Sequence, residues 1–403
     1  MRIKDIAVLN PVYSGEDLKN EIVSFSPMEC LRYDNLRTYT IPFSQAKGKY
    51  TYFGNNDVLF AKVTPCFENL NTAIAQNLLN GVGFGSSEIN VLRLKENVSP
   101  RYVFYLVCSK PFIDNGCASM CGVGGLKRIS PRAVNTFEFA LPSPKDQYMI
   151  TAYLDRKCEK IGLQIELLER KADAYKRLRR SIINRAVTRG LNPDVPLKSS
   201  GNDWIGDIPV HWRIERNKKL LVERKENIGD DTSYQLLSLT LNGVIIRDMD
   251  AGGKFPIEFN NYKKVYPNNL IFCLFDMDET PRTIGISTHK GMITGAYDVF
   301  DVVTDIVISK WIYYFYFVID QRKALKPYYT GLRKVVKAQN FANIHVPIPP
   351  KEEQLQIVDY LDEKCGKIDA IVEKIYIKIE RLKELKCSLI NEVVTGKRAI
   401  NNH

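Results

Sequence analysis

The most regular pattern of apolar and polar positions in the chain runs from residue 154 to residue 186. Apolar side chains recur there at alternating intervals of four and three residues, which is the spacing of a coiled-coil seam. The ten seam positions are Leu154, Cys158, Ile161, Ile165, Leu168, Ala172, Tyr175, Arg179, Ile182 and Ala186. The pattern predicts a long helix that packs along this seam. An amphipathic helix packed only on its own globular module remains the alternative, although it would not require so strict a period.

The same seam occurs a second time, 207 residues further along the chain. Its positions are Leu361, Cys365, Ile368, Val372, Ile375, Ile379, Leu382, Lys386, Leu389 and Val393. Residues 147–188 align with residues 354–395 without a gap, and 18 of these 42 residues are identical. In each copy nine of the ten seam positions are apolar, and the single cation, Arg179 or Lys386, falls at the same place. The sequence therefore predicts two equivalent helices.

The repeat extends weakly into the residues before each helix. FEFALPSP and IHVPIPPK both alternate apolar and polar residues before a proline, which predicts a strand followed by a helix start. The matching segments are residues 137–144 with 344–351, GLKRI at Gly125 with GLRKV at Gly331, and NNDVLFAKV around Asp57 with PNNLIFCLF around Asn269. Further upstream the two halves diverge, so each helix follows a variable globular module.

We expect four parts along the chain. They are a first module at residues 1–142, a first repeated spacer helix at 143–190, a linker with a second module at 191–349, and a second repeated spacer helix at 350–403. Gly190 and the two prolines after it end the first helix. Both modules mix strand-like patterns with short helical ones, so the predicted fold class is α+β.

Pairing of the two helices within one chain restricts their direction. An antiparallel pair lets the second helix return toward the first module. From Leu154 to Ala186 the helix is roughly 50 Å long at about 1.5 Å per residue. This length corresponds to roughly one and a half turns of DNA, at about 34 Å a turn. The predicted architecture is two mixed β-rich modules separated by an intramolecular antiparallel coiled coil, related as a pseudo-twofold tandem repeat.

Composition and charge narrow the class of partner. The 403 residues carry 57 Lys and Arg against 46 Asp and Glu, a net charge of +11, which favours an anionic partner such as nucleic acid. Nine cysteines without framework spacing indicate reduced thiols and a cytoplasmic location. The start of the chain lacks the apolar core of a signal peptide. The longest apolar run, WIYYFYFVI from Trp311, is too short to span a membrane and is expected to be a buried strand or helix.

Motifs that could carry chemistry are weak. NPVY at Asn10 and the glycines of GVGFGSSE at Gly81 lack the context of a methyltransferase. DMDE, residues 276–279, could hold Mg²⁺ for a nuclease. We favour an acidic turn whose carboxylates hold Arg282 and present it outward. Cys117 and Cys121 lack the further ligands that a structural zinc site needs.

Readout of a DNA sequence requires cations and amides on exposed loops. A glycine before a basic pair lets the backbone approach a phosphate, which favours the two Gly-Leu-basic-basic segments. The candidate DNA-binding residues are Lys62, Lys127 and Arg128 in the first module, and Arg282, Arg333, Lys334, Lys337 and Gln339 in the second. The first helix adds a basic face of Lys176, Arg177, Arg179, Arg180, Arg185 and Arg189, which could contact DNA or partner subunits.

The chain resembles the specificity (S) subunit of type I restriction–modification systems over essentially its whole length. The resemblance is carried by DWIGDIPVHW, NDVLFAKVTPCFEN, FDMDETPRTIGIS and the paired helix starts at Gln147 and Gln354. The first half lacks a WIG-IP-HW segment at its own start.

This resemblance implies a protein without a catalytic site. The two modules would be target recognition domains that read the halves of a split double-stranded DNA target. The helices would set the spacing and dock two methyltransferase (M) subunits, with restriction (R) subunits completing the complex. S-adenosylmethionine, ATP and Mg²⁺ are expected on those partners and no cofactor in this chain. A self-sufficient DNA methyltransferase or nuclease, and a coiled-coil interaction protein that does not bind DNA, remain the alternatives.

Overall fold

The computed structural model describes residues 1–15, 18, 21–122, 125–229, 233–248 and 259–400. The chain forms two compact units, which we call unit 1 (Met1–Glu169 with Tyr376–His403) and unit 2 (Arg170–Ile375). Two long helices, α6 (Pro144–Arg189) and α9 (Lys351–Val394), contribute residues to both units. Gly190 follows α6 with a φ of 71°, a left-handed conformation that commonly ends helices.

Unit 1 contains two four-stranded sheets. The first has the order β1-β10-β7-β8 and is antiparallel throughout, whereas the second has the order β5-β2-β9-β6 with β2 and β9 parallel. Their strands are β1 (Ala7–Leu9), β2 (Ile22–Ser26), β5 (Tyr39–Pro42), β6 (Thr51–Gly54), β7 (Val58–Ala61), β8 (Thr72–Ile74), β9 (Val82–Gly85) and β10 (Ile89–Leu94). The remaining elements are β3 (Leu31–Arg32), β4 (Asn35–Leu36), α1 (Ile3–Ile6), α2 (Phe43–Ala46), α3 (Pro100–Val107), α4 (Lys110–Ala118) and α5 (Pro131–Thr136).

Unit 2 repeats the first of these sheets. Its antiparallel sheet has the order β14-β21-β18-β19, and β18 in this sheet aligns in sequence with β7 of unit 1. The strands are β14 (Leu221–Glu223), β18 (Leu270–Phe272), β19 (Ile284–Ile286) and β21 (Asp298–Val302). Five two-stranded ladders surround it: β11 (Leu197–Ser199) with β12 (Asp207–Pro209), β13 (Arg213–Arg216) with β24 (His345–Ile348), β15 (Leu237–Thr240) with β16 (Gly243–Ile246), β17 (Lys263–Val265) with β20 (Gly291–Ile293), and β22 (Tyr329–Thr330) with β23 (Val335–Val336). The short helices are α7 (Ser309–Arg322) and α8 (Ala338–Ala342).

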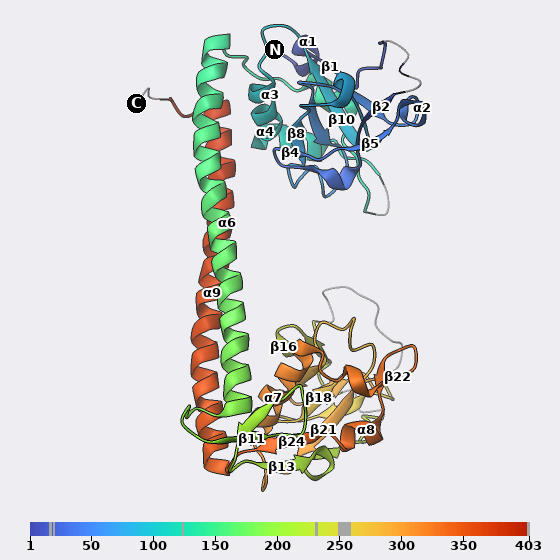
Figure 1. The fold of residues 1–403 in the computed structure, drawn as a ribbon. Helices are drawn as coiled ribbons and strands as arrows, with labels where there is room; N and C mark the ends of the chain where they lie inside the picture. The colour runs from blue at the N-terminus through green and yellow to red at the C-terminus, as the bar shows by residue number, and fades with distance from the viewer. Residues whose placement is uncertain (16–17, 19–20, 123–124, 230–232, 249–258, 401–403) are drawn as a thin grey trace. The chain divides into compact units, whose positions relative to one another are not determined.

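The long helices run antiparallel in both units. In unit 1 the start of α6, at Leu154, shares a core with the end of α9, at Leu389 and Val393. In unit 2 the end of α6, at Ile183, shares a core with the start of α9, at Leu361. Figure 1 shows the two helices side by side, α6 in green and α9 in red. The predicted antiparallel coiled coil is therefore confirmed, and all twenty seam positions are buried or half-buried.

Two local predictions have different outcomes. The expected strand forms before α9 as β24, but residues 137–144 form only the isolated bridge between Glu138 and Arg2. The reason is that the chain turns into helix α1 at Ile3, directly after Arg2, whereas β13 continues beside β24 for four residues. The apolar run from Trp311 lies in α7, which is buried. Among the described residues no helix is long and apolar enough to cross a membrane.

Candidate nucleic-acid interface

The first candidate loop, residues 125–128, is fixed to the end of strand β7 in unit 1. Thr64 N donates to the Lys127 carbonyl at 3.0 Å, and Thr64 Oγ1 donates to the Gly125 carbonyl at 2.8 Å. Ile129 N donates to the Lys62 carbonyl at 2.9 Å. These contacts bring the three predicted residues of this unit, Lys62, Lys127 and Arg128, onto adjacent segments. Residues 123–124, which precede this loop, lie outside the described part.

Arg128 is engaged by a carboxylate of its own unit. Its Nη2 and Nε lie 2.7 and 2.9 Å from the two oxygens of Glu88, and this hydrogen-bonded pair lowers the pKa of Glu88. Both Arg128 and Lys127 are exposed. Because Glu88 offsets the charge of Arg128, Lys127 is the better placed of the two for a phosphate.

In unit 2 the equivalent loop, residues 331–334, lies at the turn between β22 and β23. Asp276 N donates to the Arg333 carbonyl at 2.7 Å, which repeats the contact between Thr64 and Lys127. The Gly-Leu-basic-basic repeat thus marks a backbone contact that both units use. Gly331 has a φ of 68° and Gly125 a φ of 81°, so both turns need the freedom of glycine.

The acidic turn, Asp276–Glu279, neutralises part of this loop. Arg333 Nη2 lies 2.7 Å from Asp276 Oδ2, and Lys334 Nζ lies 3.3 Å from Asp278 Oδ2. The Arg333 guanidinium also covers the ring of Phe275, at 5.0 Å from its centroid. The side chain of Arg333 remains 69% exposed, so it can still meet solvent or a ligand. Lys337 and Gln339, at the start of α8, are exposed as well.

The prediction that the carboxylates of the acidic turn hold Arg282 was wrong. The acidic turn binds Arg333 and Lys334, whereas Arg282 Nη2 donates to the Leu241 carbonyl at 3.2 Å. Its guanidinium lies over the ring of Phe317, 4.4 Å from the centroid. Local sequence could not reveal this, because the ring belongs to α7 and the carbonyl to the turn after β15.

The repeated helix starts hold each long helix to a globular unit. Gln147 accepts from Ser99 N at 2.9 Å and donates to the Pro142 carbonyl at 2.9 Å. Gln354, which is fully buried, accepts from Ile308 N at 2.9 Å and donates to the Pro349 carbonyl at 3.0 Å. In each unit the glutamine therefore joins the long helix to the residue before α3 or α7.

The aspartates of the repeated motif act in the same way. Asp155 accepts from Arg101 and from the hydroxyl of Tyr105, both at 2.7 Å. Asp362 accepts from Lys310 and, at 2.6 Å, from the hydroxyl of Tyr314. Burial and these carboxylates raise the pKa of both tyrosines. The heptad pattern did not reveal that these aspartates bind α3 and α7. The identity of the two repeated motifs was the feature of the sequence that could have indicated it.

The two seam cations lie on aromatic rings. Arg179 packs on Phe317 at 5.2 Å from the ring centroid and forms an ion pair with Asp369 at 3.0 Å. Lys386 Nζ lies 3.7 Å from the ring centroid of Tyr33, and burial lowers the pKa of Lys386. Position 162 is equivalent to Asp369 and carries a glycine, so Lys386 has no counterpart of that ion pair.

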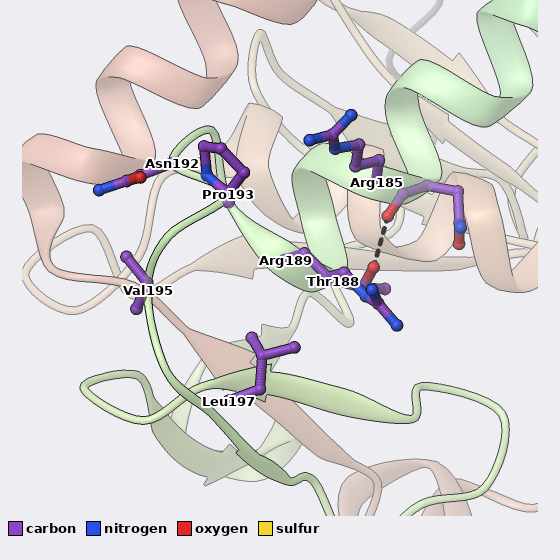
Figure 2. A pocket seen from close by; sticks show the side chains of 9 residues that line it. Arg185, Thr188, Arg189, Asn192, Pro193, Val195 and Leu197 are labelled. Atoms are coloured by element: carbon purple, nitrogen blue, oxygen red, sulfur yellow. Dashed lines mark hydrogen bonds between the residues drawn. The ribbon is translucent and has the colours of Figure 1, made fainter.

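The end of α6 borders a pocket of about 480 Å³ (Figure 2). Arg185 and Arg189, from the predicted basic face, line it together with Asn192, Val195 and Leu197 of the following linker. Thr188 Oγ1 donates to the Asn184 carbonyl at 2.7 Å and completes the last turn of the helix. The pocket combines cationic and apolar walls, which suits a segment of protein bearing carboxylates.

The segment DWIGDIPVHW closes the junction of the two helices in unit 2. Trp212 is fully buried, and its Nε1 donates to Glu353 at 3.1 Å. The Nε2 of His211 lies 2.7 Å from the same carboxylate. This segment therefore fixes the start of α9. Within the described residues no group of three or more His, Cys, Asp or Glu side chains is arranged to hold a metal ion.

Comparison with known proteins gives matches in sequence and in fold. Residues 254–381 match the family described as type I restriction modification DNA specificity domain. The specificity subunit of the type I restriction enzyme EcoEI of Escherichia coli is 32% identical over 152 residues, which is 37% of this chain and 25% of that protein. The specificity subunit of EcoAI, also of Escherichia coli, is 36% identical over 128 residues, which is 31% of this chain and 22% of that protein. The chain thus matches about a quarter of the length of these relatives.

Solved structures extend the likeness to the whole chain. A chain from a study of complex assembly and conformational transition of the type I R-M system superposes with a TM-score of 0.72, at 15% identity, over 99% of this chain and 97% of that one. The HsdS subunit of Thermoanaerobacter tengcongensis superposes with a TM-score of 0.50, at 16% identity, over 99% and 96%. The resemblance inferred from the sequence is therefore confirmed: residues 254–381 match the type I restriction modification DNA specificity domain, and the whole chain shares its fold with the solved HsdS subunit.

Proposed function

We propose that the chain is the DNA sequence-recognition subunit of a type I restriction–modification complex and has no catalytic site of its own. The observation that carries the proposal is the match of residues 254–381 to a DNA specificity domain. The curated relatives are named specificity subunits, which favours this function over a self-sufficient methyltransferase or nuclease. The net charge of +11 is suited to a DNA ligand.

Each globular unit would read one half of a split double-stranded target. Lys62, Lys127 and Arg128 would face DNA in unit 1, and Arg333, Lys334, Lys337 and Gln339 in unit 2. Of these, Lys127 and Lys337 are exposed, while Arg128 and Arg333 meet internal carboxylates. The first pair would add most to affinity through phosphates, and the second would hold the loop conformation as well.

Partner docking is the other part of the proposal. Methyltransferase subunits, two in number, and through them restriction subunits would bind the helices and bring S-adenosylmethionine, ATP and Mg²⁺. The pocket at the end of α6 supports such a contact, because Arg185 and Arg189 stand beside the exposed Leu197. The antiparallel helices would then act as the spacer between the two reading units.

Methylation mapping across a host genome tests the function. A strain that expresses this chain with its methyltransferase partner should carry methylated adenines in one split sequence, and a strain lacking only this chain should carry none there. Methylation that persists at the same sites without the chain would contradict the proposal. Binding of S-adenosylmethionine by the purified chain, measured by calorimetry, would favour the enzyme alternative.

A further inference from the structure

One connection in unit 2 holds the tips of two hairpins. The connection, Asp276–Arg282, joins strands β18 and β19. Its first residue binds the backbone of Arg333 at the tip of the β22–β23 hairpin, at 2.7 Å. Its last residue, Arg282, binds the Leu241 carbonyl at the tip of the β15–β16 hairpin, at 3.2 Å. The two tips are therefore anchored to a single short segment.

Arg282 is better placed to hold a turn than to contact a phosphate. The residue is half-buried, and its guanidinium covers Phe317. Its Nε and Nη1 are buried and have no hydrogen-bond partner among the described residues. A phosphate contact requires exposed N–H groups, and two of those of Arg282 are buried. Its hydrogen bond to the Leu241 carbonyl therefore indicates that Arg282 holds the turn of the hairpin.

The β15–β16 hairpin is seated closely on the neighbouring strands. A Cβ at Gly285 would lie 2.6 Å from side-chain atoms of both Leu239 and Val244, so the hairpin approaches β19 as only glycine allows. At the tip, Asn242 N donates to Thr240 Oγ1 at 3.2 Å, which fixes the turn. The backbone of the tip is thus held by the close contact of the hairpin with β19 and by the hydrogen bond within the turn.

The tip presents side chains suited to the edges of bases. Leu241 is 63% exposed and Asn242 is also exposed. The major groove admits a two-stranded ribbon, asparagine can bind adenine through two hydrogen bonds, and an apolar side chain can contact the thymine methyl group. The exposed cations Arg333 and Lys337 lie on the second anchored hairpin and the helix that follows it. This combination favours duplex DNA over a protein partner.

We propose that Asn242 reads a base of the half-site recognised by unit 2, and that Arg282 is a positioning residue that holds the turn bearing Asn242. The inference rests on the proposed DNA-recognition function and assigns that function to a particular tip. Asn242 makes the sequence-dependent contact, and Arg333 and Lys337 supply the phosphate contacts beside it.

The test uses the full chain assembled with its methyltransferase partner, and duplexes that carry the target and every single-base variant of this half-site. Asn242→Ala should lower the preference for the target base by about tenfold or more at one or two adjacent positions and leave other positions unchanged. Arg282→Ala should lower the preference at the same positions, and Arg282→Lys, which keeps a donor and a cation, should restore it. Asn227→Ala, at an exposed asparagine of unit 2 outside the two anchored hairpins, is the matched control.

Each other outcome has a defined meaning. Unchanged base preference in Asn242→Ala overturns the assignment of the reader. A salt dependence that falls by about one phosphate contact in Arg282→Ala overturns the positioning role. Loss of complex assembly with unchanged base preference overturns the DNA assignment, because the tip is then a protein contact. A wild-type complex with no sequence preference contradicts the proposed function itself, which separates the two failures.

Discussion

The seam cations show how one position can acquire different surroundings in two copies of a helix. Arg179 meets both an aromatic ring and Asp369, whereas Lys386 meets a ring in a more buried place where burial lowers its pKa. Charged residues on a coiled-coil seam reduce stability unless a partner compensates. Arg179 has an ion-pair partner in Asp369, whereas Gly162 stands at the equivalent position beside Lys386.

Substitution of each cation by methionine should therefore have different effects. Arg179→Met should lower the free energy of unfolding by about 1 kcal/mol, because the ion pair and the cation–π contact are lost. Lys386→Met should leave stability unchanged or raise it at pH 7. The lowered pKa of Lys386 means that its charged form disfavours folding. This cost is complete below the folded-state pKa and disappears as the pH rises from there to the ordinary pKa of lysine. Urea unfolding of the full-length variants measures both effects, and equal destabilisation would contradict the distinction.

Single residues were predictable from sequence where their role was local. Gly190 was expected to end the first helix, and it does so with a φ of 71°. The partners of Arg282 were not predictable, because Leu241 and Phe317 lie 41 and 35 residues away in sequence. The internal carboxylates of Arg128 and Arg333 were hidden for the same reason.

At the scale of elements, the residues that are identical in the two long helices indicate more of the helices' contacts than the heptad pattern does. The heptad pattern predicted the helices and their seam, which the structure confirms. It did not explain why Gln147, Asp155, Gln354 and Asp362 recur, because none of them is a seam position. The structure supplies the reason: each pair fastens a long helix to α3 or α7 through buried backbone groups and tyrosines.

Gln354 offers a direct test of this fastening. Gln354→Ala removes the partners of Ile308 N and of the Ile306 and Pro349 carbonyls, which lie 2.9, 3.2 and 3.0 Å from its side-chain atoms. The expected loss is about 2–4 kcal/mol, because these backbone groups are left unpaired next to a small cavity. Gln356→Ala, two residues away on the exposed face of α9, should change stability by less than about 0.5 kcal/mol. Chemical denaturation compares them, and similar midpoints would exclude a fastening role for Gln354.

At the scale of the whole chain, duplication explains the common strand order. The sheets β1-β10-β7-β8 and β14-β21-β18-β19 correspond strand by strand, although the sequences before the helices match only in short segments. A core tolerates such divergence when apolar character and volume are kept. Surface loops on the same frame can therefore change independently in the two units, which is what a reader of two different half-sites requires.

The proposed spacer function makes a quantitative prediction at this scale. Seven residues inserted in both helices, after Leu168 in α6 and after Ile375 in α9, preserve the seam register because they add one heptad to each. The added length is roughly 10 Å at about 1.5 Å per residue, which corresponds to about three base pairs of DNA. Methylation mapping should then find both half-sites unchanged with a gap about three base pairs longer. A four-residue insertion in α6 alone shifts its seam against α9 and should instead abolish recognition. If the double insertion changed the sequence of either half-site, or left the gap as it was, the helices would not set the spacing.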